Sequence, residues 1–115
     1  MTTFKRGEVI LVKFPYSDLI RYKKRPALVV QDETVDTGLS QRVVVQITSN
    51  LERTGVTRVL VKKDSPDGQA MGILSDSIIV ADHMATILPR EIDKVIGRCT
   101  CMPEVDDALR QVLGL

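Results

Sequence analysis

The chain has 115 residues, of which 43% are hydrophobic and 27% are charged, and its formal net charge is +1 at pH 7. This length and composition are typical of one globular domain, here expected over residues 1–115, and too short for two ordinary ones. No apolar run approaches the ~18 residues of a membrane-spanning helix, and the N-terminus has no signal-peptide pattern, so we expect a cytoplasmic protein without membrane contact. With so little net charge, binding to a polyanion would need a local basic patch, and residues 21–25 offer one.

The first half of the chain predicts three strands, over residues 8–14, 26–31 and 42–47. Polar loops are predicted between them, over residues 16–24 and 32–41. Pro15 stops the first strand, and Pro26 suits the first position of the second, where no ladder donor is needed. Three consecutive valines in 42–47 favour a central strand that is buried on both faces. Thr48, Ser49 and Asn50 end that strand in small polar residues.

The second half predicts further extended segments and two helices. Strands or extended segments are expected over residues 56–62, 77–81, 84–88 and 97–100, and a Ser-Pro-Asp-Gly turn within 64–72. A short helix is expected over residues 89–96, starting at its proline. A C-terminal helix opening at Pro103 has an apolar face made of Val105, Ala108, Leu109, Val112 and Leu113. That face needs a cover, either the sheet or a second copy of the chain. The elements together predict a small, strongly twisted sheet or partly closed barrel with helices packed on it.

The two cysteines, Cys99 and Cys101, are separated by one residue. If their segment is a strand, the side chains point to opposite faces and a disulfide between them is geometrically poor. A metal site would need further ligands, yet the chain has one histidine, His83. We therefore expect buried structural thiols and no metal site.

Any catalysis must use arginine, hydroxyl and carboxylate groups, because the chain lacks a phosphate-binding glycine loop, a serine-hydrolase motif and a second histidine. Those groups suffice for RNA cleavage in which the 2′-hydroxyl attacks the adjacent phosphorus. That reaction needs neither a water nucleophile nor a metal ion. It needs stabilisation of charge on the non-bridging oxygens, and it benefits from a proton acceptor and a proton donor. The arginine fork suits the first task.

Arg25 and Thr48 are the two residues best placed for such chemistry, because each lies at the end of a predicted strand. Each also has a structural interpretation: Arg25 as a solvated basic residue, and Thr48 as a hydroxyl that caps a turn. His83, beside Asp82, is either an acid–base group or a structural histidine.

At these residues the chain resembles the MazF/PemK family of toxin-antitoxin toxins. The matching motifs are Arg6-Gly7-Glu8-Val9, Phe14-Pro15, Arg25-Pro26-Ala27-Leu28-Val29-Val30, Ile47-Thr48-Ser49-Asn50, Asp76-Ser77-Ile78-Ile79 and Ile96-Gly97-Arg98. The resemblance implies a mainly β fold, an SH3-like barrel of the MazF/CcdB type with about five to seven strands and a C-terminal helix. It implies a homodimer that cuts single-stranded RNA at short sequences without metal or other cofactor. It also implies a cognate antitoxin whose flexible tail occupies the RNA groove.

By the same resemblance, Arg25 and Thr48 are expected to be the catalytic pair. The residues expected to bind RNA are Asp18, Tyr22, Lys23, Lys24, Ser49, Asn50, Asp82 and His83. The general base stays open among Asp18, Asp82, His83 and none of them. Two stretches depart from the family pattern: residues 19–24 lack its acidic residue and glycines, and residues 82–87 carry His83 and Ala85 where many members have glutamine and arginine. Two other functions stay open, a toxin of the same fold that inhibits gyrase without catalysis, and an inactive nucleic-acid-binding module.

Overall fold

The computed structural model describes residues 4–15, 22–52 and 54–115, and residues 16–21 of the predicted loop 16–24 lie outside them. Its strands are β1 (Glu8–Pro15), β2 (Tyr22–Val29), β3 (Arg42–Thr48), β4 (Arg58–Val61), β5 (Ser77–Ile87) and β6 (Ile92–Arg98). Its helices are α1 (Pro66–Met71), the 3₁₀ turn η1 (Pro89–Glu91) and α2 (Met102–Leu113). No helix in this part of the chain has the length and apolar character needed to cross a membrane.

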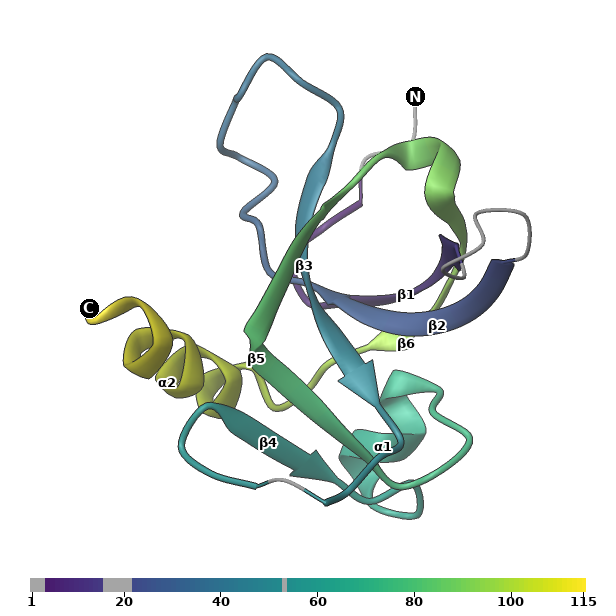
Figure 1. Ribbon diagram of the computed structural model, residues 1–115, viewed down its shortest axis with the longest axis vertical. Helices are drawn as coiled ribbons and strands as arrows, with labels where there is room; N and C mark the ends of the chain where they lie inside the picture. The colour runs from purple at the N-terminus through teal and green to yellow at the C-terminus, as the bar shows by residue number, and fades with distance from the viewer. Residues whose placement is uncertain (1–3, 16–21, 53) are drawn as a thin grey trace.

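The strands form one six-stranded antiparallel sheet in the order β4-β5-β3-β2-β1-β6. The sheet bends so strongly that β1 and β2 cross the direction of β3 and β5 (Figure 1). The predicted mainly β fold with a C-terminal helix is confirmed. The sheet is not closed into a continuous barrel, because its order ends at β4 on one side and β6 on the other.

Apolar side chains pack on both faces of the bent sheet. One core gathers Val9, Leu28, Val45 and Ile79 with residues of the two α-helices, and the other gathers Ile10, Val12, Val29 and Val44. Neighbouring residues of β3 serve different cores, since strand side chains alternate between faces. Val44 and Val45 are both almost fully buried, as predicted for a central strand.

The strand β2 begins before the predicted position, so Pro26 lies inside the strand and pairs with Leu11 of β1. Pairing of β2 with β3 starts only at Ala27. The first residues of β2 therefore pair with β1 alone. A proline is tolerated at such a position, because one side of the strand has no ladder to which an N–H could donate.

The helix α2 packs on the sheet at β4 and β5. Of the two covers considered for its apolar face, the sheet is therefore the one observed. Val105 and Ala108 are buried, and Val105 packs in the core that contains Val45, whereas Leu113, also predicted to lie on the apolar face, is half exposed. An ion pair between Arg6 and Asp106 fastens α2 to the start of the chain.

The predicted helix over residues 89–96 is wrong. Only the single turn η1 is helical, and residues 92–98 form β6, which pairs with β1. Local sequence favoured a helix, but the edge of β1 offers a ladder of backbone hydrogen bonds, and long-range pairing overrides the local preference.

The predicted turn within residues 64–72 contains the short helix α1. Ser65 Oγ accepts a hydrogen bond from Gly68 N at 3.0 Å, and Pro66 occupies the first turn. The Ser-Pro-Asp-Gly pattern is thus a helix start, since serine at the N-cap followed by proline is as typical of a helix start as of a turn. The extended segments predicted separately over 77–81 and 84–88 are one strand, β5.

The expectation that Cys99 and Cys101 point to opposite faces is also wrong. The strand ends at Arg98, and both thiols turn into the same core, where their Sγ atoms lie 3.5 Å apart. Both cysteines are buried and free of disulfides, as expected for structural thiols.

Backbone packs directly against backbone where β6 meets the end of α1. A Cβ on Gly97 would lie 2.4 Å from the carbonyl oxygens of Ala70 and Met71. Gly72, with a φ of +71°, makes the reciprocal approach, since a Cβ there would lie 2.3 Å from the carbonyl oxygen of Ile96. Only glycine permits both approaches, so the Ile96-Gly97-Arg98 motif has a structural reason.

We predict that Gly97→Ala destabilises the protein by about 1–3 kcal/mol, because the added methyl group must push α1 away from β6. Urea denaturation followed by circular dichroism measures this change. Gln111→Ala, at an exposed position of α2, is the control and should stay within about 0.5 kcal/mol. Equal unfolding midpoints for the two variants would contradict the packing argument.

Candidate functional site

Arg25 and Thr48 lie on neighbouring strands. In the register of β2 with β3, Ala27 pairs with Gln46, and Arg25 and Thr48 each lie two residues further along their strands. Continuing the register therefore brings Arg25 opposite Thr48 and on the same face of the sheet. Both side chains are half-buried. The sequence motifs had placed each residue at a strand end; the pairing brings the two ends together.

Arg25 and Thr48 line one cavity of about 430 Å³, here named the basic cavity. Its polar and charged lining residues are Lys23, Lys24, Arg25, Thr48, Ser49, Ser75, Ser77 and Lys94, and its other lining residues are Leu11, Pro26, Ile47, Gly72, Ile73, Leu74 and Ile96. This lining combines several cations with hydroxyl groups and contains no carboxylate. Such a surface suits an anion that carries several oxygen acceptors, as a phosphodiester does.

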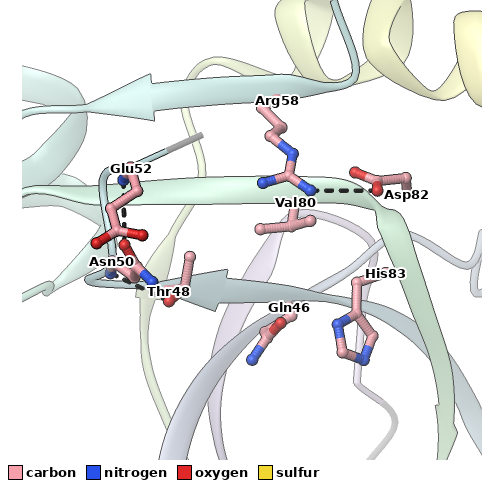
Figure 2. A pocket seen from close by; sticks show the side chains of 8 residues that line it. All are labelled: Gln46, Thr48, Asn50, Glu52, Arg58, Val80, Asp82 and His83. Carbon is pink, nitrogen blue, oxygen red and sulfur yellow. Dashed lines mark hydrogen bonds and ion pairs between the residues drawn. The ribbon is translucent and has the colours of Figure 1, made fainter. Parts of the chain in front are cut away.

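The Thr48 hydroxyl oxygen accepts a hydrogen bond from Asn50 N at 3.1 Å (Figure 2). Asn50 Oδ1 in turn accepts one from Glu52 N at 3.1 Å. The turn-capping role considered for Thr48 is therefore present. It does not occupy the hydroxyl hydrogen, which stays available to donate to a ligand oxygen.

A second cavity of about 310 Å³ adjoins the first at Thr48 and is here named the polar cavity. It is lined by Gln46, Thr48, Asn50, Glu52, Arg58, Val80, Asp82 and His83 (Figure 2). Gln46 of β3, Val80 of β5 and Arg58 of β4 are paired across the three strands and form its floor. Amides, carboxylates and a guanidinium provide both donors and acceptors here, as the edge of a nucleobase requires.

A bulge in β5 brings Asp82 and His83 into the polar cavity. Val45 pairs with Met84, but the next residue, Gln46, pairs with Val80, so residues 81–83 have no partner on β3. Bulges of this kind redirect side chains and are common beside functional sites. The imidazole of His83 points away from the Asp82 carboxylate (Figure 2).

Arg58 of β4 and Thr57, the residue just before it, bind the Asp82 carboxylate. Arg58 donates to Oδ2 at 3.3 Å, and Thr57 Oγ1 donates to Oδ1 at 3.2 Å. Partial burial alone would raise the pKa of Asp82, but hydrogen bonds from Arg58, from its own backbone amide and from Thr57, together with the Arg58 charge, lower it below its ordinary value. Asp82 is therefore ionised at neutral pH.

Lys23, Lys24 and Ser49, all expected to bind RNA, line the basic cavity, and Asn50, Asp82 and His83 line the polar cavity. Asp18 and the side chain of Tyr22 lie outside the described residues. Across residues 4–15, 22–52 and 54–115, no three His, Cys, Asp or Glu side chains gather as metal ligands would.

The sequence did not predict the cavity-lining positions of Lys94, Arg58 and Glu52. Lys94 lay in a segment predicted to be helical, and Arg58 was one exposed residue of a half-exposed strand. Only alternation with valines marked Arg58 as facing away from the core, and that pattern does not separate a site residue from a solvated one.

Residues 5–113 match the family of PemK-like, MazF-like toxins of type II toxin-antitoxin systems. The bent β-sheet with its C-terminal helix is thus a toxin domain, and because the match covers most of the chain, the chain belongs to this family. No curated protein sequence matches it.

Solved structures share the fold at low sequence identity. A mycobacterial endoribonuclease in complex with its cognate antitoxin superposes with a TM-score of 0.73 and 24% identity, covering 98% of this chain and 97% of the other. The Mycobacterium tuberculosis toxin MazF-mt6 gives 0.72 and 23%, covering 94% and 97%. MazF of a MazE–MazF structure from Deinococcus radiodurans gives 0.75 and 17%, covering 99% of both chains.

We predict that Arg58→Gln raises the pKa of Asp82 toward its ordinary value, because the guanidinium that favours the carboxylate is removed. Carboxyl carbon chemical shifts followed by NMR during a pH titration measure this pKa. Asp76 is the internal control, since the Lys63 backbone amide is the main cause of its lowered pKa. In the wild type the Asp82 contribution to stability is present above the ordinary carboxyl pKa and is lost as the pH falls through the lowered one. An Asp82 pKa that is the same in both proteins would refute the assignment.

Proposed function

We propose that the protein is a toxin that cleaves single-stranded RNA at short sequences, with Arg25 and Thr48 as its catalytic pair. The observation that carries the proposal is that Arg25 and Thr48, which the strand register brings opposite each other, line the same basic cavity. Membership of the MazF-like toxin family supports it, as does the fold shared with proteins described as endoribonucleases.

In the proposed reaction, the 2′-oxygen of one nucleotide attacks the adjacent phosphorus and forms a new P–O bond while the bond from phosphorus to the 5′-oxygen breaks. The products are a 2′,3′-cyclic phosphate and a free 5′-hydroxyl. The Arg25 guanidinium and the Thr48 hydroxyl donate to the non-bridging oxygens, on which negative charge develops in the transition state. Since the nucleophile belongs to the RNA itself, the step requires no metal-bound water.

The proton of the attacking 2′-hydroxyl needs an acceptor, and the 5′-oxygen leaves more easily when it is protonated. Asp82 and His83 both line the cavity next to Thr48, so both stay candidates for the acceptor. Asp82 is ionised and thus able to accept a proton, although the ion pair with Arg58 weakens it as a base. Arg25 is a poor proton donor because its pKa lies far above 7.

We further propose that the protein acts as a homodimer and is inhibited by a cognate antitoxin with a flexible acidic tail. The cations of the basic cavity, Lys23, Lys24, Arg25 and Lys94, would attract such a tail as they would attract RNA. A tail bound there would exclude the substrate. Related structures described as complexes with an antitoxin support this partner.

We predict that the purified protein cuts a long single-stranded RNA at discrete positions in EDTA, leaving 5′-hydroxyl ends. Arg25→Ala and Thr48→Ala should each lower the rate by about 10²-fold or more, because each removes a donor to the developing charge. End-labelling and primer extension identify the cut positions and the chemistry of the ends.

The controls carry the same changes outside both cavities: Arg110→Ala on α2 and Thr37→Ala in the exposed loop before β3. Both should cut like the wild type. An intact RNA, with inhibition of DNA supercoiling instead, would replace the proposal by a gyrase-inhibiting toxin. An intact RNA that is nevertheless bound would indicate an inactive nucleic-acid-binding module.

We predict that His83→Gln changes the shape of the pH–rate profile, because it removes the imidazole that is a candidate proton acceptor. Asp82→Asn should then retain the wild-type shape. Single-turnover cleavage rates at saturating enzyme measure both profiles. An unchanged profile in His83→Gln would eliminate the imidazole as the base.

A further inference from the structure

Gln46 lies on the same face of the sheet as Arg25 and Thr48. It comes two residues before Thr48 on β3, and its partner on β2, Ala27, comes two residues after Arg25. Side chains two residues apart on a strand project to the same face and lie about 7 Å apart along it. Gln46 is therefore the β3 side chain next to Thr48 on the face that carries the proposed catalytic pair.

The strands on either side of Gln46 place apolar residues beside it. Ala27 of β2 and Val80 of β5 pair with Gln46, and both are buried. Gln46 itself is half-buried, and a carboxamide that loses water at such a position needs hydrogen-bond partners. It makes no hydrogen bond with the other seven residues labelled in Figure 2, all of which the structure describes. Its donor and its acceptor therefore stay available to a ligand of the polar cavity.

The polar cavity surrounds this carboxamide with further acceptors. Asp82 and Glu52 contribute carboxylates, and the guanidinium of Arg58 forms an ion pair with Asp82 at 3.3 Å. Glutamine, glutamate and aspartate bind the amino groups of adenine and cytosine, whereas an arginine fork binds guanine. Because Arg58 is committed to Asp82, the cavity favours a base that carries an exocyclic amino group beside a ring nitrogen.

We propose that Gln46 determines the base preference at one nucleotide of the cleavage site and selects adenine or cytosine over guanine or uracil, an inference that rests on the proposed function. The carboxamide oxygen accepts a hydrogen bond from the amino group, and the carboxamide N–H donates to the adjacent ring nitrogen. A phosphate bound at Arg25 and Thr48 brings the base of an adjoining nucleotide toward Gln46, because the three side chains share one face of the sheet. Bases of single-stranded RNA are unstacked and present these edges.

A residue that reads one base acts on one position of the cut sequence. Replacing it should change the preference at that position and leave the preferences at the other positions as they are. A change that merely disturbed the sheet would slow the cleavage of all sequences alike. The pattern of preferences thus distinguishes a specificity-determining residue from a structural one.

The test is cleavage of an RNA library that is randomised around the cut position, with the 5′-hydroxyl ends of the products sequenced. The wild type should prefer adenine or cytosine at one position by about tenfold or more, as one bidentate contact provides. Gln46→Met keeps the length of the side chain without its polar atoms, so it should abolish this preference alone. Gln111→Met, at an exposed position of α2, is the matched control and should keep every preference.

Gln46→Glu is the second variant, and it decides the question if Gln46→Met is inactive. It keeps an acceptor for the amino group, and its carboxylate repels the carbonyl oxygens of uracil, so the preference for adenine and cytosine over uracil should persist. Unchanged preferences in Gln46→Met, or equal cleavage at uracil by Gln46→Glu, would refute the base site and leave the ribonuclease proposal standing. A wild type that favours neither adenine nor cytosine at any position would refute it as well.

If the wild type or both variants leave RNA intact, binding replaces cleavage as the measurement. Fluorescence anisotropy then compares the Kd values of short labelled oligomers of adenosine, cytidine and uridine. Weaker binding of the uridine oligomer by the wild type, lost in Gln46→Met, supports the base site even where an inactive wild type has overturned the ribonuclease proposal. The same ratios of Kd in both proteins would refute the base site.

Discussion

The pairing of β3 with β2 on one side and with β5 on the other determines where the side chains of the candidate site lie. On the β2 side, the register of Ala27 with Gln46, continued by two residues, carries Arg25 toward Thr48 at the end of β3. On the β5 side, the register jumps after Val45, and the bulge that results turns Asp82 and His83 toward the same strand end. Thr48 therefore lines both cavities. A regular β3–β5 ladder, without the bulge, would place Asp82 and His83 differently relative to Thr48.

The two cavities divide charge in a way that the overall composition conceals. The net charge of the chain is only +1, yet the basic cavity has several cations and no carboxylate. The polar cavity pairs Arg58 with Asp82 and adds Glu52 and neutral amides. The basic cavity therefore suits a phosphate backbone, and the polar cavity suits the mixed donors and acceptors of a base. A single-stranded nucleic acid presents both kinds of group side by side.

Much of the fold follows from local sequence. The valine-rich and isoleucine-rich segments predicted β1, β3 and β5, and the apolar spacing after Pro103 predicted α2 within one residue of its start. The failures occurred where distant partners decide the structure. Residues 92–96 have the composition of a short helix, but β1 offers them an edge to pair with, and the geometry of Cys99 and Cys101 depends on a strand that ends at Arg98.

The candidate site also combines features that local sequence predicts with features that distant partners decide. The motifs around Arg25 and Thr48 identified two strand ends from the sequence, whereas the bulge in β5 has no local signature. Lys94 was placed on a helix by its neighbours, and only the pairing of β6 with β1 brings it to the basic cavity. Arg58 of β4 reaches Asp82 on the neighbouring strand β5. Such relations are set by register, which a single sequence specifies only through the assembled sheet.

The pairing of the first strand with the last has a consequence for synthesis. The carbonyl of Gly7 accepts a hydrogen bond from Cys99 N at 2.7 Å, and Arg6 pairs with Asp106 on the final helix. Contacts of such high sequence separation form slowly and only when both ends of the chain are present. A nascent chain on the ribosome can build the β2–β3 ladder early, but it lacks the β6 wall until residues 92–98 have been made. The basic cavity is thus completed later in synthesis than the ladder that brings Arg25 and Thr48 together.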